Sequence, residues 1–518
     1  MRLRKVLLKM ALAALAVFLL FSVSCAAQHD LVIFHTNDVH GYAFEEKNAS
    51  GDLTRVGYDR LKSIVDADES PRKLLLDAGD VLHGQAFATA RRGELAALVL
   101  SMVGYDALAV GNHDFDYGQD RLFDLVGKYR LNFLAANVTR TDKKDALVLP
   151  SRLVKDFGDL KVGVFGLLTP ETSTATDPRN VTGLRFADPI ASAKTMVKLL
   201  KDEGVDLIIA VTHMGSEPYC KPMSQTIAAE VSGIDLIIDG HSHSETIMRV
   251  KDRDGGETLV VSTGCYFKNL GRVNVNRKED GGFAFSAQIL PASGLAVFDP
   301  DPAMREAMGV LKSELEKELG QVVMNLPFDL DGSREKVRSS STSLGRVICA
   351  SLVETTGADA AMLNGGSIRD SIASGDVTKG EMLSVLPYGN YVYLIDITGK
   401  DLISALDHGL GQPGSGAFPQ FWGMEVTAKK TVLTGTDGSK NEALAVESVK
   451  IGGQPVRDDA KYVLAINDFL HAGGDGYEMF TQYEYREFAT LEEVFRGFVT
   501  ERDEAALRSI SDARILSE

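Results

Sequence analysis

Seven side chains that can bind metal ions follow five separate apolar runs of the sequence. They are Asp38, His40, Asp80, Asn112, His213, His241 and His243. Oxygen and imidazole donors without a thiolate suit borderline or hard divalent ions such as zinc or manganese. Two such ions about 3.5–4 Å apart can ionise a shared water and hold a phosphoryl group for in-line attack. The residue types therefore predict two divalent ions and phosphoryl-transfer chemistry, with Asp80 as the bridging carboxylate.

His113 directly follows Asn112 and is placed to act as a general acid. A leaving alkoxide needs a proton or strong stabilisation, and an imidazole supplies either near neutral pH. Asp116 is predicted to orient this imidazole and to stabilise its charged form. His35 lies inside the first apolar run and is expected to be a core or supporting residue. We expect no role in the site for His83, His408 and His471, which lack matching partners, or for His29, which lies in the N-terminal tail.

Short apolar runs alternate with polar loops and helical stretches in the first part of the chain. The runs are Leu31–Thr36, Lys73–Asp77, Ala107–Val110, Asn132–Val138, Val162–Leu168, Asp206–Thr212 and Asp235–Asp239. They are continuous Val, Ile and Leu strings, which is typical of strands buried on both faces. Arg92–Val103 and Asp188–Glu203 are predicted to be amphipathic helices. The pattern predicts an α/β domain, in which sites assemble beyond the carboxyl ends of the strands.

This alternating pattern ends near Pro300, where one charged helix is predicted over Asp301–Gly320. Its terminal glycine is a typical stop signal for a helix. Beyond it, the sequence predicts a second α/β unit with more turns. The predicted organisation is a first domain at residues 29–300, a linker helix at 301–321 and a second domain at 322–518.

The N-terminus has the pattern of a secretory signal peptide. A basic region precedes an apolar stretch from Met10 to Phe21, which is too short to span a bilayer comfortably. Val23-Ser24-Cys25 resembles the end of a bacterial lipobox, which would make residues 1–25 the signal and Cys25 a lipidated N-terminus. Ordinary cleavage near Ala26 or Ala27 is the alternative. Both predict an exported protein, either periplasmic or lipid-anchored to the cell envelope.

Composition and charge exclude some classes of partner. Acidic residues outnumber basic ones 72 to 55 and the net charge is −17, which argues against a nucleic acid polymer as a partner. A locally positive pocket still suits a small anionic substrate. Four cysteines are too few for a disulfide scaffold. Cys220 and Cys265 are a candidate pair, but we favour unpaired thiols, with Cys349 in a buried helix.

The ordered set of metal-binding residues resembles that of the calcineurin-like metallophosphoesterases. The second half of the chain narrows the resemblance to the secreted 5′-nucleotidase family, which includes bacterial UDP-sugar hydrolases. The resemblance implies a four-layer α/β/β/α sandwich, a helical linker and a C-terminal α/β nucleotide-binding domain. It also implies a rotation about the linker that carries the substrate to the ions. The oligomeric state stays open.

The same resemblance implies how the ligands divide between the two ions. One ion takes Asp38, His40, Asp80 and His243. The other takes Asp80, Asn112, His213 and His241. His113 and Asp116 are similar to the family's catalytic dyad. Two positions depart from the usual pattern, since Asp114 stands where Glu is common and His243 where some bacterial members have Gln, which leaves the metal preference open.

Several loops of the second half resemble the nucleotide-binding loops of 5′-nucleotidases. Taken singly, these residues also suit surface charges, strand residues or plain turns. The resemblance implies that three arginines hold phosphate and ribose, namely Arg334, Arg338 and Arg369. It implies that Tyr388 and Phe469 stack on the base, with Tyr388 in place of a common Phe. Asn390 and Asp475 would contact the base edge and the sugar.

We therefore expect a dimetal enzyme that hydrolyses nucleoside 5′-monophosphates, with UDP-sugars and other nucleotides as further candidate substrates. A 2′,3′-cyclic-nucleotide phosphodiesterase/3′-nucleotidase is the nearest alternative, because it shares the metal-binding half. A nucleotide-binding surface protein without catalysis is the alternative from another class. The intact set of ligand residues favours an enzyme.

Overall fold

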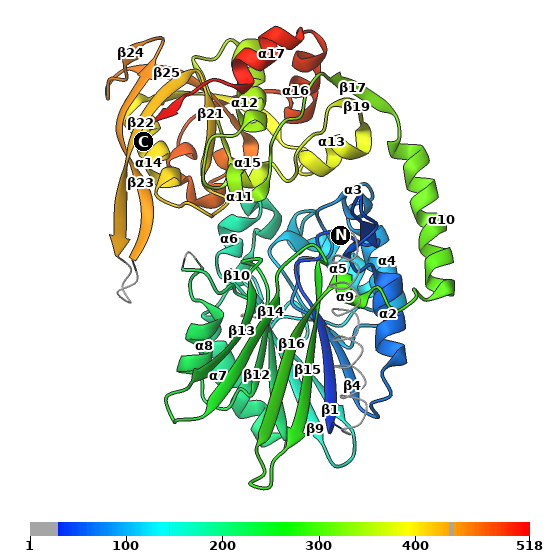
Figure 1. Cartoon of the computed structure of the whole chain (residues 1–518). Coiled ribbons are helices and arrows are strands. Elements are labelled where there is room, and N and C mark those ends of the chain that lie inside the picture. The colour runs from blue at the N-terminus through cyan, green and yellow to red at the C-terminus, as the bar shows by residue number, and fades with distance from the viewer. Residues whose placement is uncertain (1–28, 144–145, 219, 435–439, 518) are drawn as a thin grey trace, which may run out of the picture. The chain divides into compact units, whose positions relative to one another are not determined.

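The computed structural model describes residues 29–143, 146–218, 220–434 and 440–517 (Figure 1). The predicted signal peptide and Cys25 lie outside these ranges. The chain divides into two compact units. The first takes most of residues 29–313, and the second takes residues 314–517 together with the segments 84–90 and 173–182. Within the described ranges, each helix is either too short or too polar to cross a bilayer.

The first unit contains two six-stranded sheets. In spatial order, the first sheet consists of β16 (Phe283–Pro291), β15 (Asn269–Arg277), β1 (Leu31–Thr36), β4 (Lys73–Asp77), β5 (Ala107–Ala109) and β6 (Phe133–Leu134). The second consists of β13 (Glu245–Lys251), β14 (Glu257–Thr263), β12 (Leu236–Asp239), β11 (Leu207–His213), β9 (Lys161–Leu168) and β8 (Arg152–Asp156). Strands β1, β4, β5 and β6 run parallel, as do β14, β12, β11 and β9. Each parallel set therefore ends at one edge of its sheet.

The two sheets pack against each other around a shared hydrophobic core. Leu76 of β4 and Ile209 of β11 are fully buried in the same cluster. A second cluster joins the other face of the second sheet to α7 (Pro189–Asp202) and α8 (Ser224–Glu230). Helices α2 (Tyr58–Ala67) and α4 (Glu94–Val103) lie beside the first sheet (Figure 1). The expected α/β/β/α sandwich is confirmed.

Shorter elements complete the first unit. They are β2 (Glu46–Lys47), β3 (Leu53–Arg55), η1 (His113–Phe115), α5 (Gln119–Tyr129), β7 (Val138–Arg140), β10 (Leu184–Phe186) and α9 (Ala292–Leu295). Three further short helices lie in segments that group with the second unit, apart from the first residue of α6. They are α3 (Ala86–Thr89), α6 (Thr172–Ala175) and η2 (Pro178–Val181). Helix η1 belongs to the loop that follows β5 and carries His113.

The predicted strands match the observed ones closely, with one exception. Strands β1 and β4 have the predicted bounds, and four others differ by one residue at one or both ends. The single strand predicted over Asn132–Val138 is wrong, because this run forms β6 and the start of β7, which pair in different sheets. Buried Asn137 explains the break, since its side chain binds both the backbone N–H and the carbonyl of Leu168 in β9. The backbone N–H of Ala136 also donates to Gly166 of β9.

The predicted linker helix is confirmed as α10 (Pro302–Leu319). Met304 and Met308 are buried on one side of it, whereas Val310 is 56% exposed. The boundary between the compact units falls inside this helix, between Ser313 and Glu314. A charged helix therefore joins the units, and the domain limits at residues 300 and 322 remain predictions.

The second unit is built on a mixed five-stranded sheet. In spatial order its strands are β21 (Pro419–Trp422), β18 (Ala360–Asn364), β25 (Lys461–Asn467), β20 (Tyr391–Thr398) and β26 (Tyr485–Thr490). One face packs against α12 (Ser343–Thr356), α16 (Leu491–Thr500) and α17 (Glu504–Ser511). The other packs against α14 (Gly399–Leu410) and the β22 (Met424–Thr434)–β23 (Lys440–Ile451) hairpin. Both faces are covered, which confirms the predicted α/β class.

The remaining elements of the second unit are short. They are β17 (Val322–Leu326), α11 (Arg334–Val337), η3 (Gly365–Ser367), β19 (Gly375–Thr378), α13 (Lys379–Val385), β24 (Gln454–Pro455), α15 (Asp468–His471), η4 (Gly474–Gly476), η5 (Glu478–Phe480) and β27 (Leu516–Ser517). Within the described ranges, no disulfide joins Cys220, Cys265 and Cys349 to one another, so the candidate pair Cys220–Cys265 does not form. Cys349 is buried in α12.

Candidate metal centre

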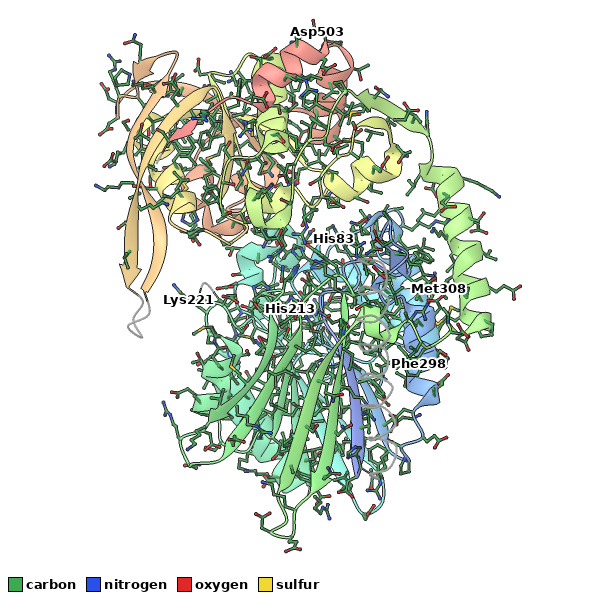
Figure 2. All side chains as sticks on the ribbon, viewed as in Figure 1. His83, His213, Lys221, Phe298, Met308 and Asp503 are labelled. Carbon is green, nitrogen blue, oxygen red and sulfur yellow. The ribbon has the colours of Figure 1, made fainter. Side chains whose placement is uncertain are left out.

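The seven predicted metal ligands come together in the first unit, where strands of its two sheets end. Six of them follow the carboxyl ends of β1, β4, β5 and β12. His213 was expected just after its strand, but it is the last residue of β11 and is fully buried (Figure 2). Asp38, His40, Asp80 and Asn112 are also buried. The two sheets therefore deliver donors from both sides to one place.

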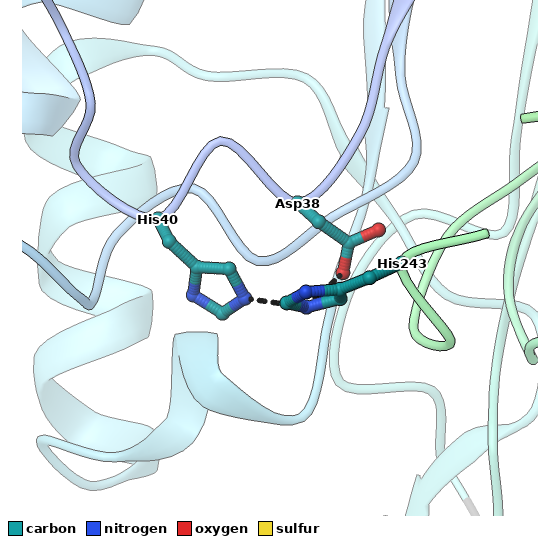
Figure 3. Close-up of side chains that lie close together, drawn as sticks. All are labelled: Asp38, His40 and His243. Carbon is teal, nitrogen blue, oxygen red and sulfur yellow. Dashed lines mark hydrogen bonds and ion pairs between the residues drawn. The ribbon is translucent and has the colours of Figure 1, made fainter. Parts of the chain in front are cut away.

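Asp38, His40 and His243 form the first group of donors (Figure 3). Nε2 of His40 lies 3.1 Å from Nε2 of His243. Nε2 of His243 lies 3.4 Å from Oδ1 of Asp38. Nε2 of His40 also lies 3.5 Å from Oδ2 of Asp80. These separations suit ligands of a single cation, because donors about 2.0–2.2 Å from one tetrahedral ion lie roughly 3.3–3.6 Å from each other.

The second group of donors lies around His213. Its Nε2 atom lies 3.1 Å from Oδ2 of Asp80 and 3.2 Å from Oδ1 of Asn112. The same oxygen of Asn112 lies 2.9 Å from Nδ1 of His241. Oδ2 of Asp80 therefore borders both groups, which is the position that a bridging carboxylate requires.

Two glycines allow the donor loops to approach each other closely. A Cβ atom on Gly111 would lie 2.1 Å from Oδ1 of Asp80. A Cβ atom on Gly240 would lie 2.9 Å from Nδ1 of His213 and 3.0 Å from Oδ2 of Asp38. Any side chain at these positions would displace a donor.

Five of the seven donors have a left-handed backbone, which is uncommon for residues other than glycine. Their φ angles are 50° at Asp38, 49° at His40, 61° at Asp80, 79° at His241 and 62° at His243. Such conformations cost about 1–3 kcal/mol each and persist where the surrounding structure enforces them. Hydrogen bonds between the loops do so here. Asp38 N–H donates to the carbonyl of Gly79, and Tyr266 N–H donates to the carbonyl of Asp38.

Carbonyl and carboxylate oxygens orient the imidazole rings. Nδ1 of His213 lies 2.7 Å from the Ala78 carbonyl, and Nδ1 of His40 lies 3.3 Å from the His83 carbonyl. With Nδ1 carrying the proton, Nε2 presents its lone pair to the other donors. On the far side of His241, Nε2 lies 3.4 Å from Oε2 of Glu171. No motif in the sequence identified Glu171 as a residue of this site.

The charges of the buried donors depend strongly on one another. Burial raises the pKa of Asp38 to about 6. Burial also acts to raise the pKa of Asp80, but the charge of His213 outweighs it and holds this pKa well below its usual range. Burial acts to lower the pKa of His213, whereas the Asp80 carboxylate raises it to about 10. A buried imidazole and carboxylate thus stabilise each other's charge.

This donor set fits a pair of divalent cations. Two imidazole nitrogens that face each other at 3.1 Å repel through their lone pairs unless a proton or a cation lies between them. Seven nitrogen and oxygen donors without sulfur match zinc or manganese better than copper(I) or an iron–sulfur cluster. The arrangement can therefore hold metal ions for hydrolytic chemistry.

His113 and Asp116 lie beside the donor groups and contact each other. Nδ1 of His113 lies 2.7 Å from Oδ2 of Asp116. The backbone N–H of His113 donates to Oδ1 of Asp80 over 2.9 Å. His113 therefore contacts Asp116 through its imidazole and Asp80 through its backbone N–H.

The structure corrects the expectation for His83. Nδ1 of His83 lies 3.3 Å from Oδ2 of Asp116, and its ring stacks on that of His113. The expectation that His83 lacks a matching partner is wrong, because its partners lie in the loop after the next strand.

His408 also has a partner, since its Nε2 lies 2.8 Å from the carbonyl of Asp475. His35 is buried in the core, as expected, and burial lowers its pKa to about 3.

Asp114 has a role that its place in the sequence did not reveal. Its Oδ1 accepts hydrogen bonds from the N–H groups of Val81 and Leu82. Its Oδ2 accepts from the N–H groups of Asp80 and Gly111. This buried carboxylate joins the loops after β4 and β5 and so holds the backbone of Asp80 in place.

The predicted nucleotide-binding residues lie in loops and short helices of the second unit. Arg334 begins α11, and its Nε atom is buried without a hydrogen bond among the described residues. Arg338 follows this helix, and its carbonyl accepts from Gly414 N–H over 2.7 Å. Arg369 N–H donates to the carbonyl of Val385 over 3.0 Å, which joins the loop after η3 to the end of α13.

The other predicted binding residues follow α13 or lie in α15 (Phe469) and η4 (Asp475). Tyr388 and Asn390 precede β20, and Asn390 Nδ2 donates to Oδ1 of Asp468 over 2.9 Å. Phe469 packs so closely on Gly474 that a Cβ there would lie 2.4 Å from its ring. Asp475 has a φ of 51°, and its Oδ2 accepts from Asn364 Nδ2 over 2.6 Å.

Comparisons with known proteins agree with both halves of the structure. The calcineurin-like phosphoesterase family matches residues 31–245, and the 5′-nucleotidase C-terminal domain matches residues 320–482. Protein UshA of Escherichia coli (strain K12) is 30% identical over 90% of each chain. Trifunctional nucleotide phosphoesterase protein YfkN of Bacillus subtilis (strain 168) is 33% identical, and the match covers 88% of this chain but 33% of that longer protein. The crystal structure of a 5′-nucleotidase precursor from Thermus thermophilus superposes with a TM-score of 0.81, at 27% identity, over 91% of this chain and 96% of that one.

Proposed function

Because this chain belongs to the 5′-nucleotidase family, which joins a calcineurin-like phosphoesterase domain to a 5′-nucleotidase C-terminal domain, we propose that it hydrolyses nucleoside 5′-monophosphates to nucleoside and phosphate. The convergence of two donor groups on Asp80 is the observation that carries this proposal. A surface cluster of histidines would have no reason to share one buried carboxylate. The enzyme is therefore a phosphoric monoester hydrolase that depends on divalent metal ions.

We assign one ion to Asp38, His40, Asp80 and His243. The second is assigned to Asp80, Asn112, His213 and His241. The distances within each group support this division, and zinc or manganese suits the donor types. When bound, the ions would supply the Lewis acidity that activates a water and neutralises charge on the phosphoryl group.

His113 assists departure of the nucleoside oxygen in this proposal. Since Oδ2 of Asp116 accepts the proton on Nδ1 of His113, the opposite nitrogen, Nε2, is the one that can carry a proton to the leaving oxygen. The Asp116 carboxylate also stabilises the positive charge of the imidazolium. Aligning this ring before the reaction avoids the cost of orienting it in the transition state.

The second unit supplies recognition of the nucleotide in this proposal. Arg334, Arg338 and Arg369 bind phosphate and ribose, because guanidinium groups bind phosphate through paired hydrogen bonds. Tyr388 and Phe469 stack on the base. Asn390 contacts the base edge, and the Asp475 carboxylate accepts hydrogen bonds from the ribose hydroxyls. Movement about the linker helix would bring the substrate to the metal ions.

A substrate panel tests the proposal directly. Protein stripped of metal would be assayed with AMP, 3′-AMP, cyclic AMP and UDP-glucose after zinc or manganese is restored singly. We expect AMP to be hydrolysed fastest, with UDP-glucose as a second substrate. A strong preference for 3′ or cyclic substrates would instead identify a 2′,3′-cyclic phosphodiesterase/3′-nucleotidase. Tight binding of AMP without release of phosphate would identify a non-catalytic binding protein.

We propose that the protein acts outside the cytoplasm, on the basis of its N-terminal signal pattern. Cys25 is the candidate site of a lipid anchor, and cleavage near Ala26 or Ala27 would give a periplasmic protein. Mass spectrometry of the mature N-terminus distinguishes these cases. An intact Met1 on the protein from cells would contradict export by either route.

A further inference from the structure

His83 occupies a position behind the proposed catalytic pair that the reaction described above does not use. It is fully buried and lies in the same loop as Asp80, between β4 and α3 (Figure 2). The plane of its ring lies 21° from that of His113, with 5.7 Å between the ring centroids. His83, His113 and Asp116 form a compact group in which one nitrogen or oxygen atom from each side chain lies within 4.8 Å of the other two.

The Asp116 carboxylate lies close to both histidines, with a hydrogen bond to His113 and a longer contact, without hydrogen-bond geometry, to His83. Its Oδ2 atom lies 2.7 Å from Nδ1 of His113 and 3.3 Å from Nδ1 of His83. The ring of Tyr117 lies against His83, with 5.3 Å between their centroids. The His83 ring therefore limits the positions that the carboxylate and the His113 ring can take.

His83 also contacts the metal centre, through its backbone. Its carbonyl lies 3.3 Å from Nδ1 of His40, whose Nε2 faces the other donors. One residue thus contacts a proposed metal ligand through its backbone and the proposed catalytic pair through its side chain. Movement of His83 would disturb the spacing between the two.

We propose that His83 is a positioning residue, which fixes the Asp116 carboxylate and the His113 ring so that Nε2 of His113 reaches the leaving oxygen. This inference rests on the proposed function, because it assigns His83 to the step that His113 assists. Its side chain acts through Asp116 and makes no contact with substrate. Misplacement of a catalytic group by about 1 Å costs up to about 10²-fold in rate, so loss of this support should lower kcat measurably.

Two substitutions test the contribution of the His83 nitrogen atoms separately from that of its ring. His83→Phe keeps a flat ring against His113 but removes the nitrogen facing Asp116. His83→Asn removes the ring but can place an amide N–H near Oδ2 of Asp116. We expect His83→Phe to lower kcat for AMP about tenfold or more, with KM and bound metal unchanged. His83→Asn should recover a substantial part of this loss.

A double-mutant cycle with Asp116→Ala tests whether His83 acts through the carboxylate. His83→Phe should cost little once Asp116 is absent, because the group that it positions is gone. The penalty should also be smaller for p-nitrophenyl phosphate, whose leaving group needs little protonation. Unfolding temperature and metal content would be measured for each variant. His29→Phe is the matched control, because His29 pairs with Asn276 away from the site and should leave kcat unchanged.

Several outcomes would overturn the proposal. They are an unchanged kcat in His83→Phe, penalties that simply add in the cycle, and equal penalties for AMP and the aryl phosphate. A third metal ion that binds the wild type and is lost in His83→Phe would show that this group is a metal site instead. Failure of the wild type to hydrolyse AMP would refute the proposed function, whereas normal hydrolysis with an unaffected His83→Phe variant would refute this inference alone.

Discussion

Nε2 of His40 and Nε2 of His243 lie 3.1 Å apart, although 203 residues separate them in the sequence. Two neutral imidazoles oriented in this way repel each other unless a proton or a metal ion joins them. The fold therefore holds these rings in an arrangement that metal binding would stabilise.

Removal of metal should abolish activity and lower stability together. A cation that binds only the folded protein stabilises it by about 2.7 kcal/mol when its concentration is 100 times its Kd. We expect chelation to lower the unfolding temperature and to stop hydrolysis of AMP, and zinc or manganese to restore both. Differential scanning fluorimetry and phosphate release would be followed on the same samples. Full activity after exhaustive chelation, verified by elemental analysis, would contradict a metal-dependent mechanism.

His113→Ala should remove the leaving-group assistance without removing the metal ions. We expect kcat for AMP to fall about 10²- to 10⁴-fold, which is the usual contribution of general acid catalysis. Metal content should stay near that of the wild type, because His113 is not among the assigned ligands. Steady-state kinetics and elemental analysis measure the two quantities. An unchanged kcat would exclude His113 from the reaction.

Gly111→Ala should disrupt the centre by steric conflict alone. The new methyl group would lie 2.1 Å from Oδ1 of Asp80, so the carboxylate or the loop must move. We expect kcat/KM to fall by about 10²-fold, together with loss of bound metal. Gly127→Ala is the matched control, because a Cβ there meets nothing within 4 Å and alanine favours the surrounding helix α5. Equal activity of both variants would show that the loops after β4 and β5 can accommodate the methyl group without displacing the metal ligands.

Tyr388→Ala and Phe469→Ala should weaken binding of the nucleotide and spare the chemical step. Stacking of a base on an aromatic side chain contributes about 1–3 kcal/mol, so the KM for AMP should rise roughly 5- to 150-fold. Hydrolysis of p-nitrophenyl phosphate, which has no base, is the internal control and should change little. Parallel losses on both substrates, with a lower unfolding temperature, would assign these rings to the fold instead.

The strands and the order of the metal-binding loops could be predicted because buried parallel strands leave long apolar runs in the sequence. The ends of β1 and β4 matched the prediction to the residue. The break at Asn137 could not be foreseen, since its cause is a pair of hydrogen bonds to Leu168 in the other sheet. The partners of His83 were missed for a similar reason, because its spacing to Asp116 follows no local periodicity. The left-handed backbone of Asp38 and His40 depends on hydrogen bonds between loops, so it cannot be predicted from the residue types.

Asp235 gives the stability of the first unit a defined dependence on pH. This half-buried carboxyl accepts a hydrogen bond from Ile208 N–H over 2.8 Å, and burial raises its pKa from the ordinary 3.8 to about 6. The folded state therefore favours the protonated form. Its contribution to stability is fully present below pH 3.8 and is lost as the pH rises through 6. The loss amounts to about 1–3 kcal/mol, the lower figure allowing for partial contact with water.

Asp235→Asn should remove this dependence, because an amide can accept the hydrogen bond from Ile208 without ionising. We expect the variant to be more stable than the wild type at pH 7–8 and equally stable near pH 4. Thermal unfolding of both proteins across this range measures the difference. Glu279→Gln, which removes the same charge at an exposed position, is the control and should follow the wild type. A stability difference that stays constant with pH would show that the side chain of Asp235 acts through its shape rather than through its charge.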